Sequence, residues 1–153
     1  MYSKDESSTI KQTFWTTFGQ YISPQLSADS LKVNWVNYKT GIKHLHFKME
    51  TANRSVSIGI VIAHPDRGIQ ELFFEQFTEL KTLMKNTLGE DWIWALHDTD
   101  EYGKTISRIY TQLDGVSVYN RADWPQLISF FKSRIIALDE FWSTAQYSFE
   151  SLK

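Results

Sequence analysis

The sequence contains no cysteine, and this absence excludes several classes of site. Without thiols there is no disulfide scaffold, no thiolate metal site and no cysteine nucleophile. Long apolar runs are also absent, since no stretch approaches the roughly 20 apolar residues that span a bilayer. The segment Met1–Ser8 is polar and acidic, unlike a secretory signal with its basic and then apolar regions. We therefore expect a cytoplasmic protein with no membrane association.

An excess of basic residues is missing too. The formal net charge is −2 and the isoelectric point is about 6.1, whereas a dominant nucleic-acid binder is usually basic. The charge is uneven, however. The segment from Asp29 to Arg54 has five basic residues against two acidic ones, which makes it +3 and leaves −5 for the rest of the chain. A local basic surface is therefore compatible with the acidic total.

Proline is scarce, and aromatic residues are abundant. The three prolines each stand between periodic segments, where they punctuate the chain. Phe, Trp and Tyr together make up 15% of the residues and predict an aromatic-rich core. A chain of 153 residues is typical of one domain. We expect a single domain over residues 1–153, with residues 1–7 as a flexible N-terminus.

Periodic apolar residues predict eight regular elements. Alternation of apolar and polar residues predicts five strands, near 31–35, 44–50, 55–62, 92–96 and 105–113. Helical spacing predicts three helices, near 8–22, 66–88 and from about Asp123 towards Phe149. The order α-β-β-β-α-β-β-α predicts an α+β domain, with a mainly antiparallel five-stranded sheet and helices packed on one face.

No strong catalytic motif is present: there is no P-loop, glycine-rich dinucleotide turn, HExxH or nucleophile elbow. A helix, three strands, a helix and a strand is also the order of restriction-endonuclease-like nucleases. Those enzymes need a carboxylate on the second strand and a carboxylate-x-Lys pair on the third to hold Mg²⁺. Glu50 ends the second predicted strand, but Ser55–Ile62 has neither partner. We therefore predict no catalytic residue and no cofactor, which leans against an enzyme.

Two histidines lie two residues apart on the clearest predicted strand. His44 and His46 would share one face, and neutral imidazole is a common metal ligand. Nothing nearby has the spacing of a third ligand, so we predict no metal site. Two solvated side chains are the simpler interpretation.

The polar side of the predicted sheet is the best candidate for a binding surface. Its residues could contact phosphate groups without reading bases. The simpler alternative is an ordinary solvent-facing side of an antiparallel sheet. The candidate nucleic-acid-binding residues are Lys32, Asn34, His44, His46, Lys48 and Arg54.

Three short signatures add a family resemblance. They are Phe14-Trp15-x-x-Phe18, Trp35-x-Asn37-Tyr38 with Gly41, and Arg121-x-Asp123-Trp124-Pro125. In this order and spacing the chain resembles the bacterial and archaeal domain-of-unknown-function family 4268, over about Ile10 to Phe149. In that family the domain often follows a restriction-endonuclease-like nuclease domain, which this chain lacks. The resemblance implies a link to nucleic-acid processing or defence, and it supplies no catalytic residues.

Three hypotheses of function remain open. The first is a non-catalytic binding or accessory module that acts with a nuclease or nucleic acid, and the basic segment favours it. The second is a nuclease-like enzyme with an unconventional or degenerate site. The third is a structural protein that forms a homodimer through its long apolar last helix. Asn37 and Arg121 are possible functional residues, because packing explains them least.

Overall fold

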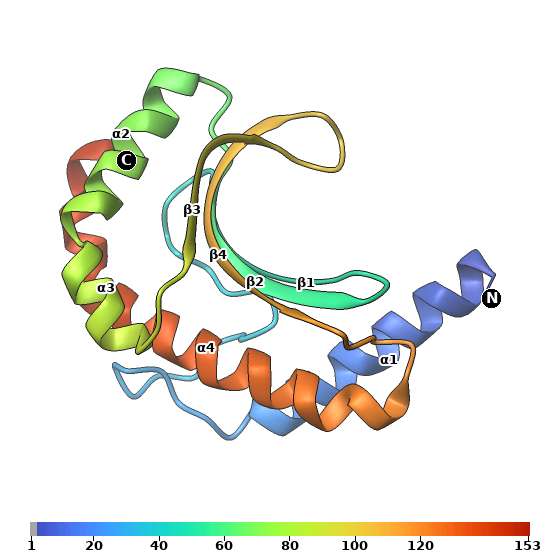
Figure 1. The fold of residues 1–153 in the computed structure, drawn as a ribbon. Helices are drawn as coiled ribbons and strands as arrows, with labels where there is room; N and C mark the ends of the chain where they lie inside the picture. The colour runs from blue at the N-terminus through green and yellow to red at the C-terminus, as the bar shows by residue number, and fades with distance from the viewer. Residues whose placement is uncertain (1–2) are drawn as a thin grey trace.

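The computed structural model describes residues 3–153 and shows an α+β domain built on one antiparallel sheet (Figure 1). The sheet has four strands in the order β1-β2-β4-β3. None of the helices formed by these residues is long and apolar enough to cross a membrane. The elements are α1 (Lys4–Ile22), β1 (Leu45–Thr51), β2 (Ser55–Ile62), α2 (Arg67–Glu79), α3 (Lys81–Leu88), β3 (Ile93–Thr99), β4 (Thr105–Asp114), η1 (Arg121–Asp123), α4 (Trp124–Ala145) and η2 (Gln146–Leu152).

The prediction of five strands is wrong, because residues 31–35 form a loop. Ser30 adopts a left-handed φ of 62°, and the Ser27 amide donates to the Leu31 carbonyl, so the chain turns just where a strand was expected to begin. Leu31 is 62% exposed, while Trp35 is buried and donates its indole N–H to the Gln25 carbonyl. The alternation of Leu31, Val33 and Trp35 therefore reflects side-chain anchoring of a loop without strand pairing.

The predicted order of elements is also wrong, and the observed order is α-β-β-α-α-β-β-α. The helix predicted over 66–88 is broken at Leu80, whose backbone leaves the helical region at φ −95°, ψ 11°. Neither Gly nor Pro marks that break in the sequence. The two ends are as predicted: Asp66 caps α2 through the Ile69 amide, and Gly89 ends α3 with a φ of 73°.

The first helix starts earlier than residue 8. Ser3 is its N-cap and forms a capping box with Glu6, so the first free amides find their acceptors four residues before the predicted start. Residues 4–7 are thus helical, whereas residues 1–2 of the segment predicted to be flexible lie outside the described residues.

The helices cover the convex side of the sheet, where α4 forms the centre of the core (Figure 1). Phe131, Ile135 and Leu138 of α4 have no exposed surface, and its C-terminal continuation buries Phe149 completely. The Phe149 ring lies 4.5 Å from Phe77 of α2, measured between centroids. The long apolar stripe of the last helix is therefore covered within its own chain.

A connection without strands or α-helices, residues 23–44, is held on α4 by side chains. Asp139 of α4 is buried and accepts hydrogen bonds from the Tyr38 hydroxyl at 2.6 Å and the Ala28 amide at 2.7 Å. Trp142 donates its indole N–H to the Thr40 carbonyl at 2.9 Å. These hydrogen bonds fix the connection on α4 without strand pairing.

The opposite side of the sheet is concave and largely uncovered by helices (Figure 1). Gly59 of β2 pairs with Tyr110 of β4 in this sheet. A Cβ at position 59 would lie 2.6 Å from the Tyr110 Cβ and 2.7 Å from the Ile109 carbonyl oxygen. Only glycine allows the two strands to approach this closely at this position.

Candidate ligand-binding cleft

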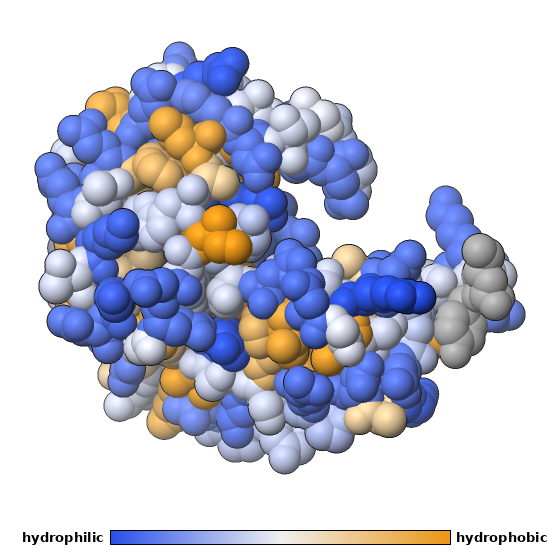
Figure 2. Space-filling view, viewed as in Figure 1, coloured by the Kyte–Doolittle hydropathy of each residue, from blue (hydrophilic) through white to orange (hydrophobic). Residues whose placement is uncertain are grey.

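A cleft of about 840 Å³ occupies the concave side of the sheet. The open strand faces of β1, β2 and β4 form its floor, and the turn of the β3–β4 hairpin forms its opposite wall. In the space-filling view the molecule is deeply hollowed there, and hydrophilic residues are prominent around the opening (Figure 2). The charged and aromatic residues that line the cleft include Lys48, Glu50, Glu101, Tyr102, Lys104, Arg108 and Tyr110.

Strand register places the floor residues in rows. Lys48 of β1 lies beside Gly59, which lies beside Tyr110 of β4. The neighbouring row brings His46, Val61 and Arg108 together in the same way. Because side chains two apart share a face, the basic side chains and the tyrosine all point to the concave side.

Arg108 is held in a fixed position on the floor. Its Nε donates to Asp98 Oδ2 at 2.9 Å, and its guanidinium carbon lies 3.9 Å from the centroid of the Tyr110 ring. A hydrogen bond from the Thr99 amide, followed by that from Arg108, lowers the pKa of Asp98. The carboxylate is therefore ionised at neutral pH and offsets part of the Arg108 charge, so Arg108 offers a positioned planar cation.

Asp100 shapes the hairpin turn that forms the wall. Its Oδ1 accepts hydrogen bonds from the Tyr102 amide at 2.9 Å and the Lys104 amide at 2.8 Å. Gly103 supplies the left-handed residue, with a φ of 77°. The turn presents Tyr102, which is 79% exposed, and Lys104 to the cleft.

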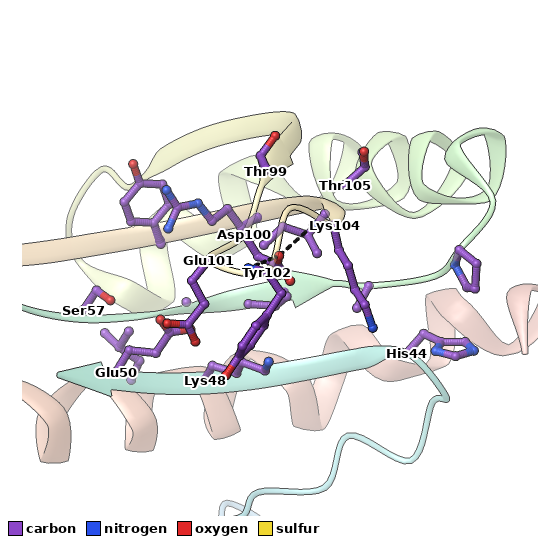
Figure 3. Close-up of a pocket in the computed structure, with 18 of the residues that line it drawn as sticks. His44, Lys48, Glu50, Ser57, Thr99, Asp100, Glu101, Tyr102, Lys104 and Thr105 are labelled. Carbon is purple, nitrogen blue, oxygen red and sulfur yellow. Dashed lines mark hydrogen bonds between the residues drawn. The ribbon is translucent and has the colours of Figure 1, made fainter. Parts of the chain in front are cut away.

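The charges of the cleft are separated along its length. In Figure 3, Glu50 of β1 and Glu101 of the turn point toward one another at one end, beside Ser57. The Lys104 side chain extends from the turn toward β1, further along toward His44. Among the described residues, neither Lys48 nor Lys104 takes part in an ion pair. The basic part of the cleft is thus available to an anionic ligand.

Two of the histidines near the cleft make ring or main-chain contacts. His44 and His64 make an edge-to-face ring contact at 5.0 Å, and His64 Nδ1 accepts from the Asp66 amide at 3.0 Å. Desolvation, followed by the charges of Lys48 and His44, lowers the pKa of His46. Within residues 3–153 there is no group of three or more histidine and acidic side chains that could hold a metal ion.

The structure brings together only part of the predicted nucleic-acid-binding set. Lys48 lies on the floor of the cleft and His44 at one end, whereas His46, on the same face of β1, is not among the residues that line it. Lys32 and Asn34 line a different groove, against α1. Arg54 is in the β1–β2 turn, where its carbonyl accepts from the Gly115 amide.

The two other polar candidates have structural contacts outside the cleft. The Asn37 amide donates to the Asn34 side chain at 3.1 Å and belongs to the connection before β1. Arg121 stacks on Trp124 at 4.7 Å, at the start of α4. Asp123 accepts from the Ser117 amide and makes no side-chain cap to the helix that follows it.

Four residues of the cleft were not predicted from the sequence as site residues: Tyr102, Lys104, Arg108 and Tyr110. A signal for two of them was present: Arg108 and Tyr110 are two apart in a strand and therefore share a face. Nothing in the local sequence indicated that the sheet would curl and bring the hairpin turn over β1.

The comparisons with known proteins identify the family. The profile described as Domain of unknown function (DUF4268) matches residues 10–146. The chain belongs to this family. The matched region of the DUF4268 chain runs from α1 through the end of α4, so the whole cleft lies inside it. No curated protein and no solved structure was found to match.

Proposed function

We propose that the protein is a non-catalytic binding module whose concave cleft takes a short single-stranded segment of nucleic acid. The observation that carries the proposal is the convergence of Lys48, Lys104 and Arg108 with Tyr102 and Tyr110 in one cleft. Proteins that bind single strands combine basic grooves, which follow the phosphates, with aromatic rings on which bases stack. The residues needed for both kinds of contact are present on facing walls.

The size and charge of the cleft define the ligand further. A volume of about 840 Å³ suits a few nucleotides of one strand and is too small for a duplex. Glu50 and Glu101 repel phosphate at their end, so the strand occupies the end near Lys48 and Lys104. Contacts to phosphate predict binding that weakens steeply with salt and shows little sequence preference.

An accessory role follows from the absence of nuclease ligands. The strand that would carry the carboxylate-x-Lys pair is β2, whose concave side presents Ser57, Gly59 and Val61. A binding module of this kind would act beside a nuclease supplied by a partner. The sequence motifs resemble a family in which the domain often follows a nuclease domain, and this resemblance supports a nuclease as the partner.

Charge reversal tests the proposal. We expect Lys48→Glu/Lys104→Glu to weaken binding of a fluorescein-labelled oligothymidylate at least about tenfold at low salt, since each change removes one phosphate contact and adds a repulsion. Fluorescence anisotropy is the measurement. The control is Lys32→Glu/Lys81→Glu, which changes the charge equally outside the cleft. Absence of binding by the unmodified protein at low salt, or equal effects of the two variants, would refute the proposal.

The pH dependence gives an independent measurement. His46 lies on the same face of β1 as Lys48 and carries charge only below its lowered pKa, so protonation should strengthen binding of an anion beside β1 only at pH values below 6.5. His46→Gln should remove this strengthening and leave the affinity at pH 8 unchanged. A rise in affinity centred at or above pH 6.5, or one that persists in His46→Gln, would contradict the assignment.

A further inference from the structure

β1 is an edge strand, and the hydrogen bonds around it identify the groups on its open side. The Ala63 amide donates to the His44 carbonyl, and the Ala52 amide donates to the Ser55 carbonyl. In an antiparallel ladder, bonded and non-bonded pairs alternate. The even-numbered residues of β1 therefore bond to β2, and the odd-numbered residues direct their N–H and C=O groups away from the sheet.

Part of this edge is covered and part is open. The Leu45 amide donates to the Ile42 carbonyl, and the Leu45 carbonyl accepts from the Thr40 hydroxyl at 2.8 Å. Beyond Leu45, the outward main-chain groups of Phe47, Met49 and Thr51 have no hydrogen-bond partner among residues 3–153. Unpaired edges of this kind accept another strand.

A groove of about 760 Å³ runs along the open edge, between β1 and residues 36–44. Its lining includes Lys39, Lys43, Lys48, His44 and His46 but no aspartate or glutamate. The two sides of the groove differ. His46 and Lys48 point to the concave side, while the Phe47 ring points to the convex side and stacks on Tyr38 at 5.2 Å.

We propose that an extended acidic segment of a partner protein binds this groove as an added strand on β1. Its main chain would bond to Phe47, Met49 and Thr51, as in other cases of strand addition. Because side chains alternate, the acidic residues of the segment would face His46 and Lys48, and the apolar residues between them would lie beside Phe47 and Met49. The recognised chemistry is thus a strand in which acidic and apolar residues alternate.

Two other occupants fit the groove less well. A second copy, pairing β1 with β1 in antiparallel fashion, would bring the turn that contains Arg54 toward Lys39 and Lys43, where like charges repel. A nucleic acid would meet the lysines but could not satisfy the alternating donors and acceptors of the edge. The groove shares Lys48 with the cleft, but the proposal rests on the edge and is independent of binding in the cleft.

Peptides methylated on alternate main-chain nitrogens test strand addition directly. The probe is a fluorescein-labelled peptide of alternating Glu and Val, with a scrambled peptide of equal composition as control. In an antiparallel pair the Val residues, opposite Phe47 and Met49, donate to β1, whereas the Glu amides point away. N-methylation of Val should weaken binding about tenfold or more, and N-methylation of Glu should not. If the peptide pairs with β1 in parallel, the effects of the two methylations are exchanged. Equal affinities of the two methylated peptides would overturn the proposal.

Two variants of the protein complete the experiment. Met49→Pro removes an outward N–H and preserves the bonds to β2, a substitution that edge strands tolerate. Lys39→Glu/Lys43→Glu reverses charge in the groove without changing a residue that lines the cleft. We expect each to reduce peptide affinity about tenfold or more, with thermal unfolding as the check on folding. Unchanged peptide affinity in the folded lysine variant would overturn the proposal. It would also be overturned by a labelled oligonucleotide that binds this edge more tightly than the peptide does, or by a dimer that Met49→Pro dissociates.

Discussion

At the scale of single residues, Asp139 holds the N-terminal third of the chain in place. It is 5% exposed and lies in the middle of α4, where an unpaired carboxylate would be costly. The Tyr38 hydroxyl and the Ala28 amide satisfy its two oxygens. Burial, followed by the hydrogen bond and charge of Asp139, raises the pKa of Tyr38 far above its usual value.

Tyr38→Phe tests this contact. We expect the free energy of unfolding at pH 7 to fall by about 1–3 kcal/mol, because the substitution leaves a buried carboxylate oxygen without its donor. Urea denaturation is the measurement, and Tyr147→Phe is the control, since Tyr147 is 69% exposed. An unchanged midpoint in Tyr38→Phe would contradict the role assigned to the hydroxyl.

The same contact predicts a dependence on pH with a definite sign. The pKa of Tyr38 is higher in the folded chain than in the unfolded chain, where it is near 10. The contribution of Tyr38 to stability is therefore fully present below pH 10 and is lost as the pH rises above that value. The difference in stability between the unmodified protein and Tyr38→Phe should accordingly shrink in alkaline solution.

At the scale of the elements, Gly59 permits the close approach of β2 and β4. We expect Gly59→Ala to destabilise the fold by about 1–3 kcal/mol, because the added Cβ overlaps Tyr110 and the strands must separate. The matched control is Gly19→Ala in α1. There the new Cβ makes an ordinary contact of 3.6 Å with Val36, and the helix should gain about 1 kcal/mol. Thermal unfolding of the two variants should shift in opposite directions, and shifts in the same direction would contradict this account.

The sequence predicted the elements whose pattern is local. β1 and β2 are found where alternation predicted them, and Asp66 and Gly89 mark the predicted ends of a helical region. The errors arose where tertiary contacts decide. Trp35 alternates like a strand residue but anchors a loop, and α2 ends at Leu80 without a local signal. The cleft was only partly predictable, because Lys104 reaches it through the curl of the sheet and not through spacing along the chain.

At the scale of the whole molecule, the C-terminal segment belongs to the central core. Phe149 contacts Phe73, Phe77 and Trp142, and all four rings are buried. We expect Phe149→Ala to lower the free energy of unfolding by about 3–5 kcal/mol. The measurement is urea denaturation at several protein concentrations, with Tyr147→Ala as the exposed control. If Phe149 served only an interface between copies, its removal would leave the stability at high dilution unchanged.

The homodimer expected through the last helix was motivated by the same apolar stripe. Because α4 and Phe149 are buried within one chain, that motive no longer points to a partner. Dimerisation stays a prediction, and light scattering against the chain mass of 17.9 kDa is its test.

The side-chain anchors of residues 23–44 have a consequence for the order of events during synthesis. The bonds from Ala28 and Tyr38 to Asp139, and from Trp142 to Thr40, join residues that are 111, 101 and 102 positions apart. At 5–20 residues per second, a ribosome needs roughly 5–20 s to extend the chain by about 100 residues. During that interval the hydrogen bonds that hold the connection on α4 cannot form, although β1 can already pair with β2. We expect nascent chains that stop before Asp139 to aggregate or recruit chaperones, and chains that have cleared α4 to do so far less.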